Sequence, residues 1–157
     1  MTTALPMFRL LLLVLAALFL AAAPSRAQNI VVMVNGDPIT DFDIDQRSKL
    51  DQLTTQKTPS RQEVINELID DRVKLKEGKK YGVDPGVSDI NQSFEGMAQR
   101  MRISTDQLTK SLEVKGVRPE TLKARMKSEM VWTSLVRGRF KEKLMVGERD
   151  VAQAVQA

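Results

Sequence analysis

Hydrophobic residues in the middle of the chain recur at the spacing of an α-helix. In residues 61–81 they cover about half of the circumference of a helix drawn at about 100° per residue, and they are Val64, Ile65, Leu68, Ile69, Val73 and Leu75. A helix that lies on a surface needs a narrower apolar stripe. We therefore predict that residues 61–81 form the central helix of the fold, with neighbours on two sides.

Polar residues mark both ends of this helix. Ser60 and Glu63 form a Ser-x-x-Glu capping box, in which each side chain accepts a hydrogen bond from the other residue's backbone N–H, and Gly82 can adopt the left-handed conformation that ends a helix. Arg72 projects into the middle of the apolar arc. Its stem is expected to pack while its charged head reaches solvent or a carboxylate; a binding role is the alternative.

The first residues of the folded part read as a β-hairpin. Residues 30–34 (IVVMV) are rich in β-branched side chains, and Asn35-Gly36 favours the positive φ angles of a tight turn. Asp37 precedes a proline and is therefore expected to be extended. Two short strands are not stable alone, so this hairpin is expected to dock on the helices.

Helix signals recur along the rest of the chain. Thr40, Ser88, Ser104 and Pro119 are start signals, and the segments that follow them are about 41–53, 89–101, 105–115 and 119–144, with a short further one from 148 onward. Together with residues 61–81 they predict a mainly α-helical fold. Five to six helices would pack around the central helix, with a short N-terminal β-hairpin.

Methionine and tryptophan side chains give the most informative pattern for function. Met97 and Met101 form one pair at i, i+4 spacing, and Met126 and Met130 form another. Methionine is flexible and polarisable, and surfaces that accept many partners are rich in it. These side chains either line a peptide-binding surface or fill an irregular core.

The last long helix carries apolar residues nearly all round in its middle. Val131, Trp132 and Leu135 lie on the side away from its main apolar stripe. Either another segment covers this patch or it is an exposed binding surface. The residues predicted to bind peptide are thus Met97, Met101, Met126, Met130, Trp132 and Leu135.

The N-terminus has the pattern of a secretory signal peptide. Arg9 supplies positive charge, residues 10–23 are apolar, and Ser25-Arg26-Ala27 offers small residues before a cut after Ala27. The apolar run is short for a membrane span, which needs about 20 residues. We expect residues 1–27 to be removed on export, leaving a domain at 28–157 without a stable membrane span. An uncleaved anchor is the alternative.

Composition excludes most catalytic chemistry. The chain has no histidine and no cysteine, which removes His-based triads, Cys–His dyads and disulfides. Asp41, Asp43 and Asp45 follow the Asp-x-Asp-x-Asp pattern of a calcium-binding loop. Gln46 and Gln52, however, stand where that loop needs glycine and glutamate. The adjacent Asp70 and Asp71 point about 100° apart and cannot form a paired-carboxylate site. No cofactor, metal or catalytic residue is expected.

Net charge argues against nucleic acid as a partner. The formal charge is +4 for 157 residues, and two of these positive charges, Arg9 and Arg26, lie in the predicted signal peptide. The remaining +2 is far from the basic excess of a nucleic-acid binder.

The order of these motifs resembles the N-terminal domain of the SurA-type periplasmic chaperones. The residues that carry the likeness are IVVMVNGDPITDFDIDQR, EVINELIDDRVKLKEGKKYGV, VSDINQSFEGMAQRMRISTDQLTKSLEVKGV and LKARMKSEMVWTSLVRGRF. The resemblance implies a helical domain with a peptide-binding crevice that holds unfolded outer-membrane proteins in the periplasm without ATP.

The resemblance also implies what would follow this domain in a longer protein. Members of the family continue into parvulin-type peptidyl-prolyl isomerase domains, and a C-terminal segment often closes the chaperone core; here that segment would cover Trp132. The sequence ends at Ala157, about where an isomerase domain would begin, so no isomerase activity is expected of this chain. The alternatives are the non-catalytic N-terminal part of a secreted parvulin-type isomerase, and an assembly module that docks one fixed partner.

Overall fold

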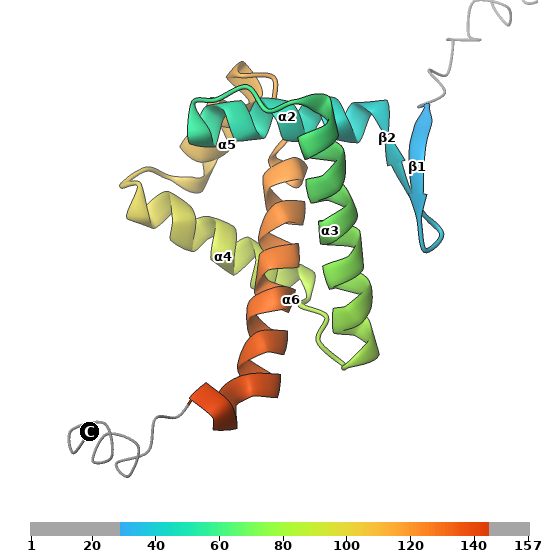
Figure 1. Ribbon diagram of the computed structural model, residues 1–157. Coiled ribbons are helices and arrows are strands. Elements are labelled where there is room, and N and C mark those ends of the chain that lie inside the picture. The colour runs from blue at the N-terminus through green and yellow to red at the C-terminus, as the bar shows by residue number, and fades with distance from the viewer. Residues whose placement is uncertain (1–28, 145–157) are drawn as a thin grey trace, which may run out of the picture.

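The computed structural model describes residues 29–144, with side chains described up to residue 139. Over this range the chain forms a β-hairpin followed by five helices (Figure 1). These elements are β1 (Ile30–Val34), β2 (Asp37–Thr40), α2 (Asp41–Thr55), α3 (Arg61–Lys80), α4 (Val87–Arg100), α5 (Thr105–Val114) and α6 (Pro119–Leu144). The predicted mainly helical fold with an N-terminal hairpin is confirmed. The expected signal peptide and the short helix from 148 lie outside the described residues.

The hairpin forms as its turn sequence predicts. β1 and β2 pair antiparallel, with Val34 opposite Asp37, and Asn35 and Gly36 both have positive φ angles, 54° and 94°. Ile39 is fully buried while Met33 is exposed. The return strand thus attaches the hairpin to the helices together with Val34 at the end of β1, whereas the first residues of β1 are exposed.

Helix α3 occupies the predicted central place, but it shares that place with α6. α3 packs against both strands, α2 and α6, whereas α6 contacts α2, α3, α4 and α5. Figure 1 shows α6 beside α3, with α4 and α5 on its other side. The broad apolar arc of α3 therefore has neighbours on two sides, as its width requires.

Two hydrophobic clusters form the core, and α2 contributes to both. The hairpin, α2 and α3 form one cluster, and its buried members are Val34, Ile39, Ile44, Val64, Ile65 and Leu68. The other lies among α2, α4, α5, the turn before α6 and α6 itself, and its buried members are Leu50, Phe94, Ala98, Leu108, Leu112, Val117 and Leu122.

Three predicted helix starts are confirmed by hydrogen bonds, and one is wrong. Thr40, Ser60 and Ser104 each accept from the backbone N–H three residues on. Ser88 does not cap α4. That helix begins at Val87, because Gly86 is extended and its N–H donates to the Asp89 carboxylate at 2.9 Å.

The apolar arc of α3 also differs from its prediction at one position. Val73 is 48 % exposed, although the hydrophobic pattern places it in the arc, whereas Asp71 is buried. Arg72 is half-buried and lines a cavity of about 270 Å³ between α2, α3 and the start of α6. The buried face of α3 is thus centred nearer Asp71 than the hydrophobic pattern suggests.

Candidate functional site

An open hollow lies between the C-terminal end of α3 and the second half of α6. Its volume is about 700 Å³. We call it the tryptophan groove, and its lining residues are Glu77, Tyr81, Val83, Trp132, Ser134, Leu135, Val136, Gly138 and Arg139. Most of this lining is apolar, which suits an apolar ligand.

Two aromatic side chains are presented to solvent in the tryptophan groove. Trp132 is 47 % exposed and Tyr81 is 49 % exposed. Arg139 Nη1 donates to the Tyr81 hydroxyl at 3.0 Å, and the Arg139 guanidinium lies 5.6 Å from the centre of the tyrosine ring. This contact joins α6 to the residue that follows α3, and Trp132 adds apolar area to the groove from α6.

A close contact between glycine and valine sets the spacing of the two helices at this groove. A Cβ atom on Gly78 would lie 2.2 Å from Cγ1 of Val131, and Val131 is fully buried. Because Gly78 has no side chain, the Val131 side chain packs directly against the backbone of α3. Val131 is therefore separated from Trp132 and Leu135, with which the sequence groups it, because it packs in this contact while Trp132, one residue on, lines the groove.

The predicted methionines lie elsewhere. Met126 and Met130 line a second hollow of about 420 Å³ between α4 and α6, which we call the methionine groove; its other residues are Asp89, Gln92, Ser93, Gly96 and Arg100. Met97 packs against the core cluster of α4 and α5, and Met101, just after α4, is 56 % exposed.

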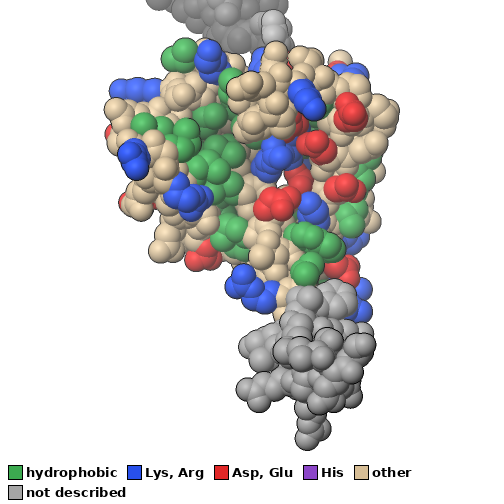
Figure 2. All heavy atoms as spheres, turned by 60° about the vertical axis from the view of Figure 1, so that its left-hand side comes forward, with side chains coloured by type: hydrophobic (Ala, Val, Ile, Leu, Met, Phe, Trp, Pro, Cys, Tyr) green, Lys and Arg blue, Asp and Glu red, His purple; other side chains and the backbone are tan. Residues whose placement is uncertain are grey.

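The six sequence-predicted residues therefore do not form one site. At 3.6 residues per turn, Met130 and Trp132 point about 200° apart on α6. Trp132 and Leu135 share the tryptophan groove, and Met126 and Met130 share the methionine groove. Figure 2, which turns the α4–α5 side forward, shows hydrophobic side chains gathered on that face with basic side chains around them.

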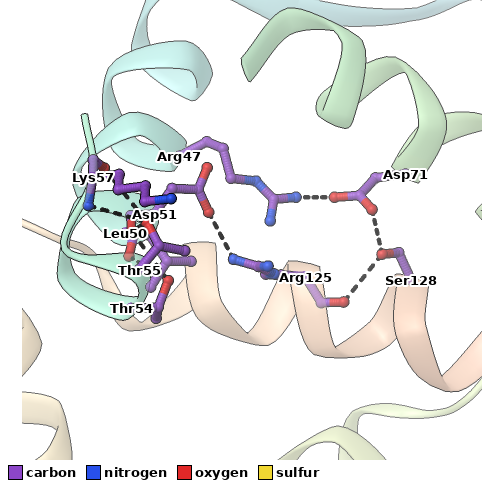
Figure 3. Close-up of polar contacts among 9 residues, drawn as sticks. All are labelled: Arg47, Leu50, Asp51, Thr54, Thr55, Lys57, Asp71, Arg125 and Ser128. Atoms are coloured by element: carbon purple, nitrogen blue, oxygen red, sulfur yellow. Dashed lines mark hydrogen bonds and ion pairs between the residues drawn. The ribbon is translucent and has the colours of Figure 1, made fainter. Parts of the chain in front are cut away.

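A buried polar network holds α2, α3 and α6 together. The sequence patterns do not predict it. Arg47 of α2 forms an ion pair with Asp71 of α3, and the Ser128 hydroxyl of α6 donates to the same carboxylate (Figure 3). Arg125 of α6 donates to Asp51 of α2 at 2.7 Å. The network fixes the position of the helix that carries both grooves.

The network could have been suspected from the spacing of one acid. Asp71 continues the series Val64, Leu68 and Leu75 at helical intervals, so it lies on the buried face of α3. Burial lowers the pKa of Arg47, and the nearby charge of Arg125 lowers it further. A guanidinium nevertheless stays charged in proteins. Asp71 is therefore needed at any ordinary pH to compensate the buried charge of Arg47.

Glu67 gives the network a testable pH dependence. Desolvation and then the negative charge of Asp51 raise the pKa of Glu67, against the opposite effect of Arg47. A raised folded-state pKa means that stability falls as pH rises through the window between the unfolded and folded pKa values. Glu67→Gln is therefore expected to stabilise the protein at neutral pH and to give no gain near pH 4. The gain should be below about 1 kcal/mol, because the side chain is largely exposed and solvent screens it.

Urea unfolding at the two pH values measures this difference. Glu113→Gln removes an exposed carboxylate from α5 and is the matched control. An equal gain from Glu67→Gln at both pH values would show that ionisation of Glu67 is not responsible.

Comparison with known proteins places the chain in a described family of domains. Residues 27–136 match the family model for the SurA N-terminal domain. The chain is 28 % identical over 149 residues to Chaperone SurA of Pseudomonas fluorescens (strain Pf-5), covering 87 % of this chain and 35 % of that protein. It is 27 % identical over 138 residues to Chaperone SurA of Pseudomonas syringae pv. tomato, covering 83 % and 32 %.

A relative from another genus gives a similar coverage. Chaperone SurA of Burkholderia lata is 25 % identical over 159 residues, covering 89 % of this chain and 35 % of that protein. The chain thus spans about a third of the length of the curated relatives it matches. The matched family model is that of the SurA N-terminal domain, and the relatives it resembles are named chaperones. No helix within residues 29–144 combines the length and hydrophobicity needed to cross a membrane.

Proposed function

Because this chain belongs to the SurA N-terminal domain family, a family of chaperones, we propose that it holds unfolded outer-membrane proteins in the periplasm without ATP. Residues 1–27 would direct export and be cleaved after about Ala27. The observation that carries the proposal is the tryptophan groove, an apolar hollow of about 700 Å³ with two half-exposed aromatic side chains.

The lining of the tryptophan groove suits extended segments of many different sequences. Trp132, Leu135 and Val136 offer apolar area, and hydrophobic attraction is non-directional, so it does not require one particular side chain. Glu77 and Arg139 lie at the same groove and can pair with the backbone or with charged neighbours of an apolar segment. Weak, sequence-tolerant binding of this kind would permit release without ATP.

The methionine groove is proposed as a second contact for the same clients. Met126 and Met130 form its apolar wall on α6, and flexible thioethers adapt to differently shaped side chains. The exposed Met101 would extend this surface, and Met97 would support it from the core side. Since the two grooves face different sides of α6, a client segment would occupy one or wrap around the helix to reach both.

Truncation of Trp132 tests the proposal. Trp132→Ala is expected to weaken the binding of a labelled, tryptophan-free peptide from an outer-membrane strand about tenfold, the loss of roughly 1.4 kcal/mol typical of an aromatic contact. The free energy of unfolding should change little, because the side chain is half-exposed. Fluorescence anisotropy of the peptide and urea unfolding of each variant measure the two quantities.

Val114→Ala is the matched control for this variant. Val114 is 83 % exposed on α5, and its truncation removes apolar surface that lines neither groove. Equal affinities of Trp132→Ala and Val114→Ala for the peptide would contradict the proposed site. Saturable binding of one folded partner, with no binding of unrelated unfolded chains, would instead identify an assembly module.

A further inference from the structure

The two walls of the methionine groove differ in chemistry. The α6 wall is built by the thioethers of Met126 and Met130, whereas polar side chains of α4, among them Gln92, Ser93 and Arg100, line the opposite wall. Polar side chains on one wall, which also include the Asp89 carboxylate, therefore face two methionines on the other across a space of about 420 Å³. Such a space admits water-sized molecules, including small oxidants.

Met130 is joined to the polar wall by a hydrogen bond. The Ser93 hydroxyl donates to Sδ of Met130 at 3.4 Å. Thioether sulfur is a weak acceptor, so this contact contributes little to stability while the sulfur is reduced. It does, however, place a donor directly beside the sulfur atom.

We propose that Met130 is a reversible oxidation site, whose sulfoxide is held by Ser93 and turns the methionine groove polar. A sulfur lone pair attacks one oxygen of hydrogen peroxide and forms an S–O bond as the O–O bond breaks. The oxygen that joins sulfur gives up its proton, which solvent water relays to the departing oxygen, and that oxygen leaves as water. Sulfur loses two electrons and the peroxide gains them. The sulfoxide oxygen is a stronger acceptor than sulfur, and methionine sulfoxide reductases can reverse the step.

The surroundings of Met130 distinguish it from the neighbouring methionines. Met97 packs against the buried core cluster, and so does Met126, which also lines the methionine groove. A sulfoxide oxygen turned toward that cluster would lose water without gaining a partner. Met101 is largely exposed, so its oxidation would have little structural effect. In the part of the chain whose side chains are described, Met130 is the methionine whose sulfur accepts a hydrogen bond. Oxidation at Met130 is thus both reachable and tolerated.

The effect of oxidation on clients rests on the proposed function. A sulfoxide at Met130 replaces part of the apolar wall with a strongly hydrated oxygen, and burying that oxygen against an apolar client segment costs free energy. Client affinity at the methionine groove should therefore fall on oxidation and return on reduction. The tryptophan groove, on another side of α6, holds no methionine among its described lining residues.

Peroxide treatment of the purified chain tests the inference by peptide mass spectrometry and thermal unfolding. Met130 is expected to gain one oxygen atom, and oxidised wild-type protein is expected to keep its Tm. Oxidised Ser93→Ala should melt about 3 °C below oxidised wild type, the shift for one lost hydrogen bond in a domain of this size. Met130→Leu treated in the same way is the control for oxidation at other methionines.

The outcomes separate this inference from the proposed function. Unmodified Met130 beside fully oxidised Met101, or equal Tm values for oxidised wild type and oxidised Ser93→Ala, would overturn the oxidation site. Peptide affinity that falls about threefold on oxidation of wild type, but not of Met130→Leu, would support the effect on clients. Equal affinity before and after oxidation would overturn that effect, and failure of the untreated chain to bind would overturn the proposed function alone.

Discussion

Asp71→Ala is expected to lower the free energy of unfolding by about 3–5 kcal/mol, the usual cost of removing one partner of a buried ion pair. The Arg47 side chain is 4 % exposed and would keep its charge without its partner. The Ser128 hydroxyl, fully buried, would lose its acceptor on the same carboxylate. Three helices meet at this carboxylate, so the loss affects the packing of α6 on α2 and α3 together.

The neighbouring acid provides a matched control for this variant. Asp70 lies one residue away on the same helix and is exposed, so Asp70→Ala should change the free energy of unfolding by less than about 0.5 kcal/mol. Replacing both Arg47 and Asp71 with apolar residues should recover most of the loss, because no buried charge is then left alone. Urea unfolding measures all three variants. A loss for Asp71→Ala no larger than that for Asp70→Ala would contradict the role given to the pair.

The second large effect concerns Gly78, where a better helix former should destabilise the protein. Alanine is favoured over glycine in a helix by about 1 kcal/mol. At Gly78, however, the added Cβ would lie 2.2 Å from Val131 Cγ1 and 2.7 Å from the carbonyl oxygen of Val83. Neither neighbour is the free end of a flexible side chain, so α3 and α6 must separate. We expect Gly78→Ala to lower the free energy of unfolding by about 2 kcal/mol or more, near the upper range for overpacking.

The same substitution at Gly96 is expected to stabilise the protein and is the control for Gly78→Ala. A Cβ on Gly96 of α4 meets no atom closer than 3.7 Å, the distance to the Arg100 side chain. Gly96→Ala should therefore stabilise the protein by about 0.5–1 kcal/mol. Combining Gly78→Ala with Val131→Ala should recover part of the loss, since the valine contact is relieved while the Val83 carbonyl remains. Thermal unfolding measures these variants. If Gly78→Ala stabilises the protein as Gly96→Ala does, then α3 and α6 do not meet closely at Gly78.

Local signals predicted most of the fold because they act over a few residues. The capping boxes at Ser60 and Ser104 and the Asn35-Gly36 turn each satisfy their own backbone groups, so no distant contact is needed to form them. The sequence predicts the start of α4 two residues too late, at Ser88 instead of Gly86, because both residue types occur at helix starts. The carboxylate of Asp89, three residues after Gly86, favours the earlier one.

Long-range contacts could not be predicted in the same way. Helical spacing places Asp71 on the buried face of α3, but it does not identify Arg47 of α2 as the partner. Spacing also groups Val131 with Trp132, whereas the close approach at Gly78 buries the valine and leaves the tryptophan half-exposed. Spacing places each methionine pair on one side of its helix, but it does not identify the neighbour that covers that side. The sequence therefore leaves both a binding surface and an irregular core open for them.

Emission from Trp132, the only tryptophan of the chain, tests the central claim most directly. A tryptophan-free peptide from an outer-membrane strand is titrated into the purified chain, and the emission maximum is followed. The half-exposed indole predicts long-wavelength emission in the free protein and a saturable blue shift as the peptide covers the tryptophan groove. An emission maximum that stays unchanged while the peptide is shown by anisotropy to bind would contradict the assignment of the client to this groove.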